Sequence, residues 1–213
     1  MSITHHPTEE TLAAFACGSL DEGRRIVVAA HLELCSSCQR LMQGLELAGG
    51  AHLEQLPGTS LIEGALEKVL AQLDGAPAAP TTTARATPDL PISVRALEPY
   101  EFGAWKWIGP GVHWRSVSVS TSKGARVFLL KAAPGTRLPH HAHDGTELTV
   151  ILKGAFTHAG GRFGVGDCDD ADNNVEHCPV VDDGEECVCL VAMEGNIRLL
   201  SFVGRLLQPL IRM

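Results

Sequence analysis

A stretch without apolar periodicity divides this 213-residue chain into two halves of different character. The stretch DGAPAAPTTTARATPDLP, residues 74–91, is rich in Pro, Ala and Thr, a composition that favours an extended linker. Apolar residues before it recur at helical spacing, and those after it fall in short β-rich runs. The sequence therefore predicts a multi-domain chain, with an all-α helical bundle at residues 1–75, a linker at 76–91 and an all-β domain at 92–213.

The pattern before the linker predicts three consecutive helices. Thr8 is a suitable N-cap for a helix that ends near residue 18, and Asp21 can cap a second helix that ends near residue 34. A third helix is expected to begin at Ser36 or Ser37 and to end near residue 50, where two glycines follow one another.

A fourth helix is expected just before the linker, where Ser60 and Glu63 have the spacing of a capping box. Its apolar residues recur every three or four positions and form a long stripe: Ile62, Ala65, Leu66, Val69, Leu70 and Leu73. This stripe can pack on the other helices of the chain or bind a partner protein, and the pattern favours neither.

The region after the linker has the pattern of an all-β domain. Residues 117–121 alternate between apolar and polar, and apolar runs occur at 125–132, 147–154 and 187–193. Short strands at this spacing, separated by Gly and Pro, are typical of a sandwich or a barrel. The tail after residue 196 is expected to form a last strand and a short helix.

The net charge of −8 argues against nucleic acid or an anionic membrane as a direct partner, because both reward clustered Lys and Arg. The N-terminus, MSITHHPTEE, lacks the apolar core of a signal peptide, and no apolar run reaches the roughly 18 residues of a membrane span. We therefore expect a cytoplasmic protein. Its seven cysteines are then thiols or metal ligands rather than a disulfide framework.

A histidine and two cysteines in the stretch HLELCSSC have the spacing of metal ligands. On one helix His31, Cys35 and Cys38 share a face, and a helix junction within the stretch also brings them together. Zinc favours four thiolate and imidazole ligands, so a fourth ligand is expected from His5 or His6. The alternative is that the cysteines are ordinary helix residues; a thioredoxin-like pair is disfavoured because no strand precedes the motif.

The pattern H-x-x-x-C-x-x-C in a small acidic helical region resembles the zinc-containing anti-sigma domain. That family folds as a three-helix bundle with a loosely held fourth helix, and it clamps an extracytoplasmic-function (ECF) sigma factor away from RNA polymerase. The resemblance implies zinc ligands at His6, or its neighbour His5, and at His31, Cys35 and Cys38. It also implies that the fourth helix contacts the sigma factor through Ile62, Leu66, Val69, Leu70 and Leu73.

A second cluster of metal-ligand types follows the pattern G-x5-H-x-H-x3-E-x6-G in residues 135–154. His141 and His143 are two apart, so in a strand both rings lie on one side, whereas His140 points away. Glu147 can return to that side from the next strand. Imidazoles together with a carboxylate suit zinc, iron or manganese.

This pattern resembles the first cupin motif and matches it at every defined position. A second cupin motif supplies a further histidine, and Gly166 and His177 have its spacing, although Asp172 and Asn174 replace its proline and glycine. The resemblance implies a jelly-roll-like cupin barrel over about residues 92–202. It also implies a second divalent metal, expected to be zinc, on His141, His143, Glu147 and His177.

Together the two halves resemble the ChrR-type zinc anti-sigma factors over nearly the whole chain. The resemblance implies that residues 1 to about 85 sequester an ECF sigma factor in a 1:1 heterodimer. It also implies that the cupin domain triggers release under photo-oxidative stress, by singlet oxygen or organic peroxide.

Two other functions remain open. The first is a metal-dependent cupin dioxygenase or hydrolase with an accessory helical domain. Such an enzyme has no use for the N-terminal zinc motif, so we expect no enzyme and assign no catalytic residue. The second is a zinc-dependent interaction module without a sensing role.

Two cysteines in the expected strand at 187–193 also face the same way. Cys187 and Cys189 are two residues apart, and they can form a redox pair or simply pack in the core. Core packing is favoured, because thiols at this spacing rarely form a disulfide without strain.

Overall fold

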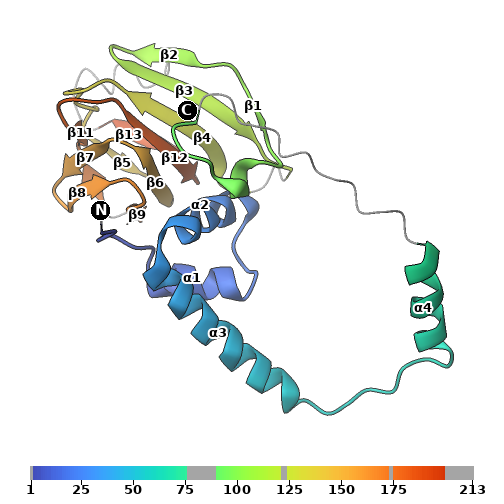
Figure 1. The fold of residues 1–213 in the computed structure, drawn as a ribbon. Coiled ribbons are helices and arrows are strands. Elements are labelled where there is room, and N and C mark those ends of the chain that lie inside the picture. The colour runs from blue at the N-terminus through green and yellow to red at the C-terminus, as the bar shows by residue number, and fades with distance from the viewer. Residues whose placement is uncertain (1, 76–89, 121–123, 173–174, 200–213) are drawn as a thin grey trace.

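The computed structural model describes residues 2–75, 90–120, 124–172 and 175–199. In it the N-terminal helices lie against one face of a large β-sheet, and two small sheets lie across the other face (Figure 1). Nearly all of the predicted linker, and the predicted C-terminal helix, lie outside the described residues. Within those residues, no helix combines the length and the apolar character that crossing a membrane requires.

The N-terminal region contains three consecutive helices: α1 (Glu9–Ala16), α2 (Glu22–Leu34) and α3 (Ser36–Glu54). Both predicted N-caps are confirmed, since the Thr8 side chain accepts from the backbone N–H of Thr11 and the Asp21 side chain from that of Arg24. Cys35 has an extended backbone and separates α2 from α3. The HLELCSSC stretch is therefore a helix junction rather than one continuous helix.

The fourth helix, α4 (Ala65–Gly75), begins later than predicted. The capping box of Ser60 and Glu63 is wrong, because Gly64 has a φ of +73°, a left-handed value that an α-helix does not contain. In Figure 1 α4 stands apart from the other helices and from the sheets. The predicted sigma-contacting side chains are between 51% and 72% exposed: Ile62, Leu66, Val69, Leu70 and Leu73.

The large sheet has seven antiparallel strands in the order β1-β3-β4-β12-β6-β9, with β2 paired to β3. Its members are β1 (Glu101–Phe102), β2 (Lys106–Gly109), β3 (Val112–Ser118), β4 (Arg126–Ala132), β6 (Glu147–Lys153), β9 (Cys168–Ala171) and β12 (Cys187–Met193). A 3-10 turn, η1 (Arg95–Leu97), precedes it. The predicted runs at 125–132, 147–154 and 187–193 are confirmed as strands.

Two three-stranded sheets complete the β region, in the orders β10-β5-β13 and β11-β7-β8. Their strands are β5 (His141–His143), β7 (Ala155–His158), β8 (Gly161–Gly164), β10 (Glu176–His177), β11 (Val180–Val181) and β13 (Ile197–Leu199). The prediction of a closed barrel is wrong for the strands described here. Strands of two to four residues form few ladder hydrogen bonds, so the small sheets do not join the edge strands β1 and β9 of the large sheet.

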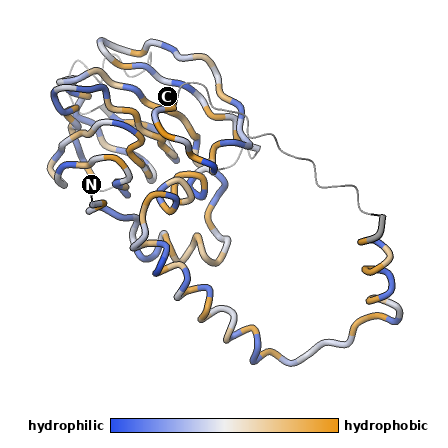
Figure 2. The backbone as a smooth tube through the Cα atoms, viewed as in Figure 1, coloured by the Kyte–Doolittle hydropathy of each residue, from blue (hydrophilic) through white to orange (hydrophobic). Residues whose placement is uncertain are grey.

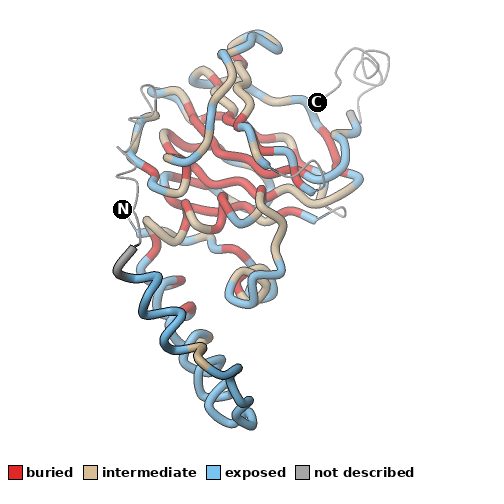
Figure 3. Tube along the Cα trace, turned by 90° about the vertical axis from the view of Figure 1, so that its right-hand side faces the viewer, coloured by how far each residue is buried: buried red, intermediate tan, exposed pale blue. Residues whose placement is uncertain are grey.

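The large sheet is buried on both faces, because alternate residues of each strand point to opposite sides. One face packs with α2 in a core that includes Ile26, Val27, Val28, Leu129, Val150 and Leu190. The other face packs beneath the small sheets in a core that includes Phe128, Ile151, Phe156, Phe163 and Val191. All seven residues of β12 are buried as a result, and Figure 3 shows the buried positions concentrated in the sheet.

The helical and β regions therefore share a core instead of forming two separate ones. The two regions approach closely at Gly23 of α2, where a Cβ atom would lie 2.6 Å from the backbone oxygen of Ala125. The sequence predicts an all-α helical bundle at residues 1–75, and the structure supports this only in part, since α2 packs mainly against the sheet. The physical reason is that α1 buries only Leu12 and α3 only Cys38 and Met42, which is too little apolar surface to cover α2.

Two candidate metal centres

The first candidate centre brings four side chains together from three segments. His31 lies in the last turn of α2, Cys35 at the helix junction and Cys38 in the first turn of α3, while His6 comes from the extended N-terminus. His31 Nε2 lies 3.3 Å from Cys38 Sγ, and His6 Nδ1 lies 3.4 Å from both Cys35 Sγ and Cys38 Sγ. We call this group the thiolate centre.

The geometry of the thiolate centre fits a tetrahedral zinc ion. Zn–S distances of about 2.3 Å and Zn–N distances of about 2.0–2.1 Å place sulfur and nitrogen about 3.5 Å apart. The Nδ1–H of His31 donates to the Gly166 carbonyl at 2.8 Å, which leaves the Nε2 lone pair directed at the cysteines. Burial, together with the neighbouring Cys35 thiol, raises the pKa of Cys38 to about 12, so a cation is needed to hold Cys38 as a thiolate at neutral pH.

The sequence left the choice between His5 and His6 open, and the structure places only His6 with the cysteines. The ring of His5 packs on Phe163 of β8 instead, with the ring centroids 4.1 Å apart. Cys17, which follows α1, is exposed and does not belong to the group.

The second candidate centre lies in the β region, where three imidazoles converge. His141 and His143 are on β5, and β10 pairs with β5 so that His177 is opposite His141. The Nε2 atom of His177 lies 2.9 Å from His141 Nε2 and 3.1 Å from His143 Nε2. We call this group the imidazole centre. His140 points away from it, as predicted, towards Glu176.

The imidazole centre directs lone pairs at one point. The Nδ1–H of His141 donates to the Pro139 carbonyl at 2.6 Å, so its Nε2 carries no proton. The Nδ1 atoms of His143 and His177 are buried without a hydrogen-bond partner, and carboxylate oxygens lie 3.7 and 3.8 Å away. With protons on these Nδ1 atoms, the Nε2 lone pairs of all three rings face one another, an arrangement that a bound cation stabilises.

Burial keeps these rings in the neutral form that binds metals. It lowers the pKa of His143 to about 4 and, with the neighbouring His141, the pKa of His177 to about 3. The pKa of His141 is also lowered by burial. A buried cluster of neutral imidazoles needs no proton removal before it takes up a metal ion at neutral pH.

The structure places Glu147, the fourth predicted ligand, slightly apart from the three histidines. Its Oε2 atom lies 3.7 Å from His143 Nδ1, on the side of that ring away from the converging Nε2 atoms. The set of ligand atoms within 4.8 Å of one another contains His141, His143 and His177, without Glu147. Burial, and the nearby Asp169 carboxylate, raise the pKa of Glu147 to about 8.

Two residues beside the imidazole centre were not predicted from the sequence. Asp169 on β9 accepts a hydrogen bond from His158 on β7 at 3.0 Å, and together with His177 they form a second, overlapping group of ligand types. In the sequence His158 does not stand at a metal-ligand spacing from either motif. Asp169 lies in an acidic run that is typical of a surface loop. The signal that could have found Asp169 is its position three residues after the cupin-motif residue Gly166.

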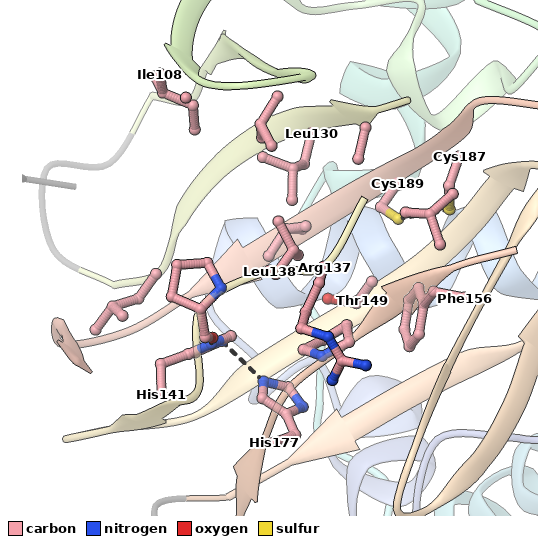
Figure 4. A pocket seen from close by; sticks show the side chains of 18 of the residues that line it. Ile108, Leu130, Arg137, Leu138, His141, Thr149, Phe156, His177, Cys187 and Cys189 are labelled. Atoms are coloured by element: carbon pink, nitrogen blue, oxygen red, sulfur yellow. Dashed lines mark hydrogen bonds between the residues drawn. The ribbon is translucent and has the colours of Figure 1, made fainter. Parts of the chain in front are cut away.

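A cavity of about 330 Å³ opens beside the imidazole centre, between the large sheet and the small ones. Its lining is mostly apolar and includes His141, Glu147, Asp169 and His177. Figure 4 shows His141 and His177 facing each other, with Cys187 and Cys189 further along the wall. The two cysteine Sγ atoms lie 3.6 Å apart. Both side chains pack in the core of this face, as the sequence favoured, and both also line the cavity.

Comparisons with known proteins agree with this architecture. Residues 99–195 match the family model described as the ChrR cupin-like domain. The anti-sigma-E factor ChrR of Cereibacter sphaeroides is 38% identical to this chain over 217 aligned residues, which cover 100% of both proteins. This chain belongs to the ChrR family. The sequence-based resemblance to ChrR-type anti-sigma factors is thereby confirmed.

A solved member of the ChrR family has the same fold. The crystal structure of Rhodobacter sphaeroides SigE in complex with the anti-sigma ChrR contains a chain that aligns with a TM-score of 0.76 and 35% identity. The alignment covers 91% of this chain and 100% of that one. The match therefore includes both the helical and the β regions of the ChrR-family chain.

Proposed function

We propose that this chain is an anti-sigma factor, a regulatory protein rather than an enzyme, which sequesters an ECF-type sigma factor in a 1:1 heterodimer. The observation that carries the proposal is the full-length relationship to the anti-sigma-E factor ChrR. The fold match to ChrR in complex with SigE supports a sigma factor as the partner. Since RNA polymerase is a cytoplasmic enzyme, a protein with this role acts in the cytoplasm.

The exposed apolar side chains of α3 and α4 support a protein partner for this region. Soluble chains rarely leave a long run of large apolar residues uncovered unless another molecule packs on it. Figure 2 shows apolar segments along both helices, and the exposed set includes Leu47 and Leu53 of α3 and Leu66, Leu70 and Leu73 of α4. Residues 1–75 also carry ten acidic and four basic side chains, which suits a basic partner surface.

We propose that zinc occupies the thiolate centre, held by His6, His31, Cys35 and Cys38. Four protein ligands leave no open position, so zinc there supplies structural cross-linking and no catalysis. The donor set supports this, because it joins the N-terminal segment, α2 and α3 at one point.

We also propose the division of the chain into a zinc-binding domain at residues 1–75, a linker at 76–91 and a cupin domain at 92–213.

We propose a second divalent metal, zinc in preference to iron or manganese, at the imidazole centre. His141, His143 and His177 would hold it, and Glu147 remains the predicted fourth ligand. A divalent ion there supplies Lewis acidity to small molecules that enter the cavity. Release of the sigma factor under photo-oxidative stress then follows if singlet oxygen or an organic peroxide favours a state of this domain that binds sigma less tightly.

In-vitro transcription tests the proposed function. RNA polymerase is loaded with the ECF sigma factor encoded beside this gene, and the full chain is added in increasing amounts. Inhibition should be complete near one equivalent. It should require a large excess for Leu66→Glu/Leu70→Glu, which places charge on the apolar stripe.

The matched control is Lys68→Ala/Gln72→Ala on the same helix, which leaves the apolar stripe intact. This control should inhibit like the unaltered chain. Transcription that continues at a tenfold excess of the full chain refutes the proposed function.

A further inference from the structure

Residues Gly166–Asp170, with the sequence GDCDD, touch both candidate metal centres. We call them the bridging segment. They run from the turn after β8 into β9, at the place where the N-terminal helices meet the β region. The cupin resemblance explains only its first glycine, and neither centre uses any of its side chains as a ligand.

On the helical side, the bridging segment orients a ligand of the thiolate centre. The carbonyl of Gly166 accepts the 2.8 Å hydrogen bond from His31 Nδ1, which fixes the tautomer that directs Nε2 at Cys38. Gly166 has a φ of +88°, and a Cβ atom there would lie 2.5 Å from Ile3 Cδ1. Only glycine allows the carbonyl to approach His31 in this way.

The bridging segment also holds the N-terminal stretch that carries His6. On one side of His6, Asp167 Oδ1 accepts from the backbone N–H groups of Thr4 at 2.7 Å and His5 at 2.9 Å. On the other side, Asp170 Oδ2 accepts from the backbone N–H of Thr8 at 3.0 Å and from the Thr11 hydroxyl at 2.7 Å. The position of His6 therefore depends on two carboxylates of the segment.

On the β side, Asp169 points the opposite way. It alternates with Cys168 and Asp170 along β9, so its carboxylate faces the cavity while its neighbours face the helices. Its Oδ2 atom accepts from His158 Nε2 at 3.0 Å and lies 3.8 Å from the buried, unpartnered Nδ1 of His177. A carboxylate behind a ligating imidazole orients the ring and favours the ligating tautomer.

We propose that the bridging segment positions ligands of both metal centres, so that metal at the imidazole centre strengthens metal binding at the thiolate centre. Metal at the imidazole centre fixes His177, which fixes Asp169 and the backbone of β9. β9 continues the bridging segment, which carries the Gly166 carbonyl that holds His31 and the two carboxylates that hold the stretch around His6. Linkage requires the same strengthening, by the same factor, in the reverse direction. The inference rests on the two centres of the proposed function.

Cobalt(II) distinguishes the two centres in the intact chain, because only thiolate ligands give an intense sulfur-to-cobalt charge-transfer band. Competition with a chelator then yields the affinity of the thiolate centre separately. In His141→Ala, which removes an imidazole ligand that does not touch the bridging segment, this affinity should fall about 10- to 100-fold. Asp169→Ala should cause a similar fall, and the double variant should fall no further.

The reverse direction and the controls complete the test. Cys38→Ser should weaken metal binding at the imidazole centre by the factor measured for His141→Ala. Asp169→Asn keeps the size of the side chain and one acceptor oxygen, so its thiolate-centre affinity should lie between those of Asp169→Ala and the unaltered chain. This variant replaces Asp169→Ala in the test if Asp169→Ala does not fold. Asp182→Ala loses an ion pair with Arg162 and a hydrogen bond from the Thr157 hydroxyl, but Asp182 belongs to neither centre, so this variant should bind both metals like the unaltered chain.

Two results overturn the inference and are distinct from each other. If the chain binds two metal ions and its thiolate affinity is the same in His141→Ala and Asp169→Ala as in the unaltered chain, the centres exist but are independent. If the unaltered chain binds fewer than two metal ions, the proposed centres are refuted together with their coupling. Neither result depends on whether the chain inhibits transcription.

Discussion

Replacing Gly by Ala should have opposite effects on stability at two helical positions, because only one of them packs against the sheet. At Gly23 of α2 a Cβ atom would lie 2.6 Å from the Ala125 oxygen and 2.9 Å from Val127 Cγ2. Overpacking of this kind costs about 1–3 kcal/mol, and the better helix propensity of alanine offsets up to about 1 kcal/mol. We therefore expect Gly23→Ala to destabilise the chain by about 1–2 kcal/mol.

Thermal unfolding followed by circular dichroism measures this difference. For a chain of this length, about 1 kcal/mol shifts Tm by about 2–4 °C, so Gly23→Ala should lower Tm by about 2–8 °C. Gly44 of α3 is the matched control, since no atom lies within 4 Å of its Cβ position. Gly44→Ala should raise Tm by about 2–4 °C through helix propensity alone. If both variants raise Tm, α2 does not dock on the sheet as described.

Three further predictions concern caps, core and metal. Burial opposes ionisation of Asp21, but hydrogen bonds from Arg24 and Ala125 hold its pKa below the ordinary value. Asp21→Ala should therefore lower the free energy of unfolding by about 1 kcal/mol above about pH 4. This loss should vanish as the pH falls through the folded-state pKa of Asp21. Urea unfolding at several pH values measures it. Leu190 is fully buried in the core that the sheet shares with α2. Leu190→Ala should therefore lower the free energy of unfolding by about 2–5 kcal/mol in the same assay. A chelator should lower the Tm of the unaltered chain by more than that of Cys35→Ser, because only the unaltered chain also loses the metal that joins three segments at the thiolate centre.

Features that depend on neighbouring residues were predictable from the sequence. The caps Thr8 and Asp21 need only a backbone N–H two or three residues away, and the strands around residues 130, 150 and 190 follow from apolar runs. Ligand spacing is similarly local, so His31, Cys35 and Cys38 could be grouped from their positions in the chain alone. His177 was grouped with His141 only through the spacing of the second cupin motif, since four strands separate β5 from β10 in the chain.

Features that depend on distant packing were not predictable. The failed capping box at Ser60 reflects the left-handed conformation of Gly64, which no local pattern announces. The docking of α2 on the sheet and the contact between His31 and Gly166 join residues more than a hundred positions apart. Asp169 and His158 meet because β9 and β7 belong to different sheets that face each other, a relation that periodicity does not encode.

The most direct test of sigma sequestration is a competition for the sigma factor itself. A fluorescently labelled ECF sigma factor is bound to core RNA polymerase, and the full chain is titrated in while fluorescence anisotropy reports the polymerase-bound fraction. We expect sigma to leave the polymerase with an end point at one equivalent of the chain, as a 1:1 complex that light scattering confirms. Sigma that stays on the polymerase at a large excess of the chain would show that the chain does not sequester it.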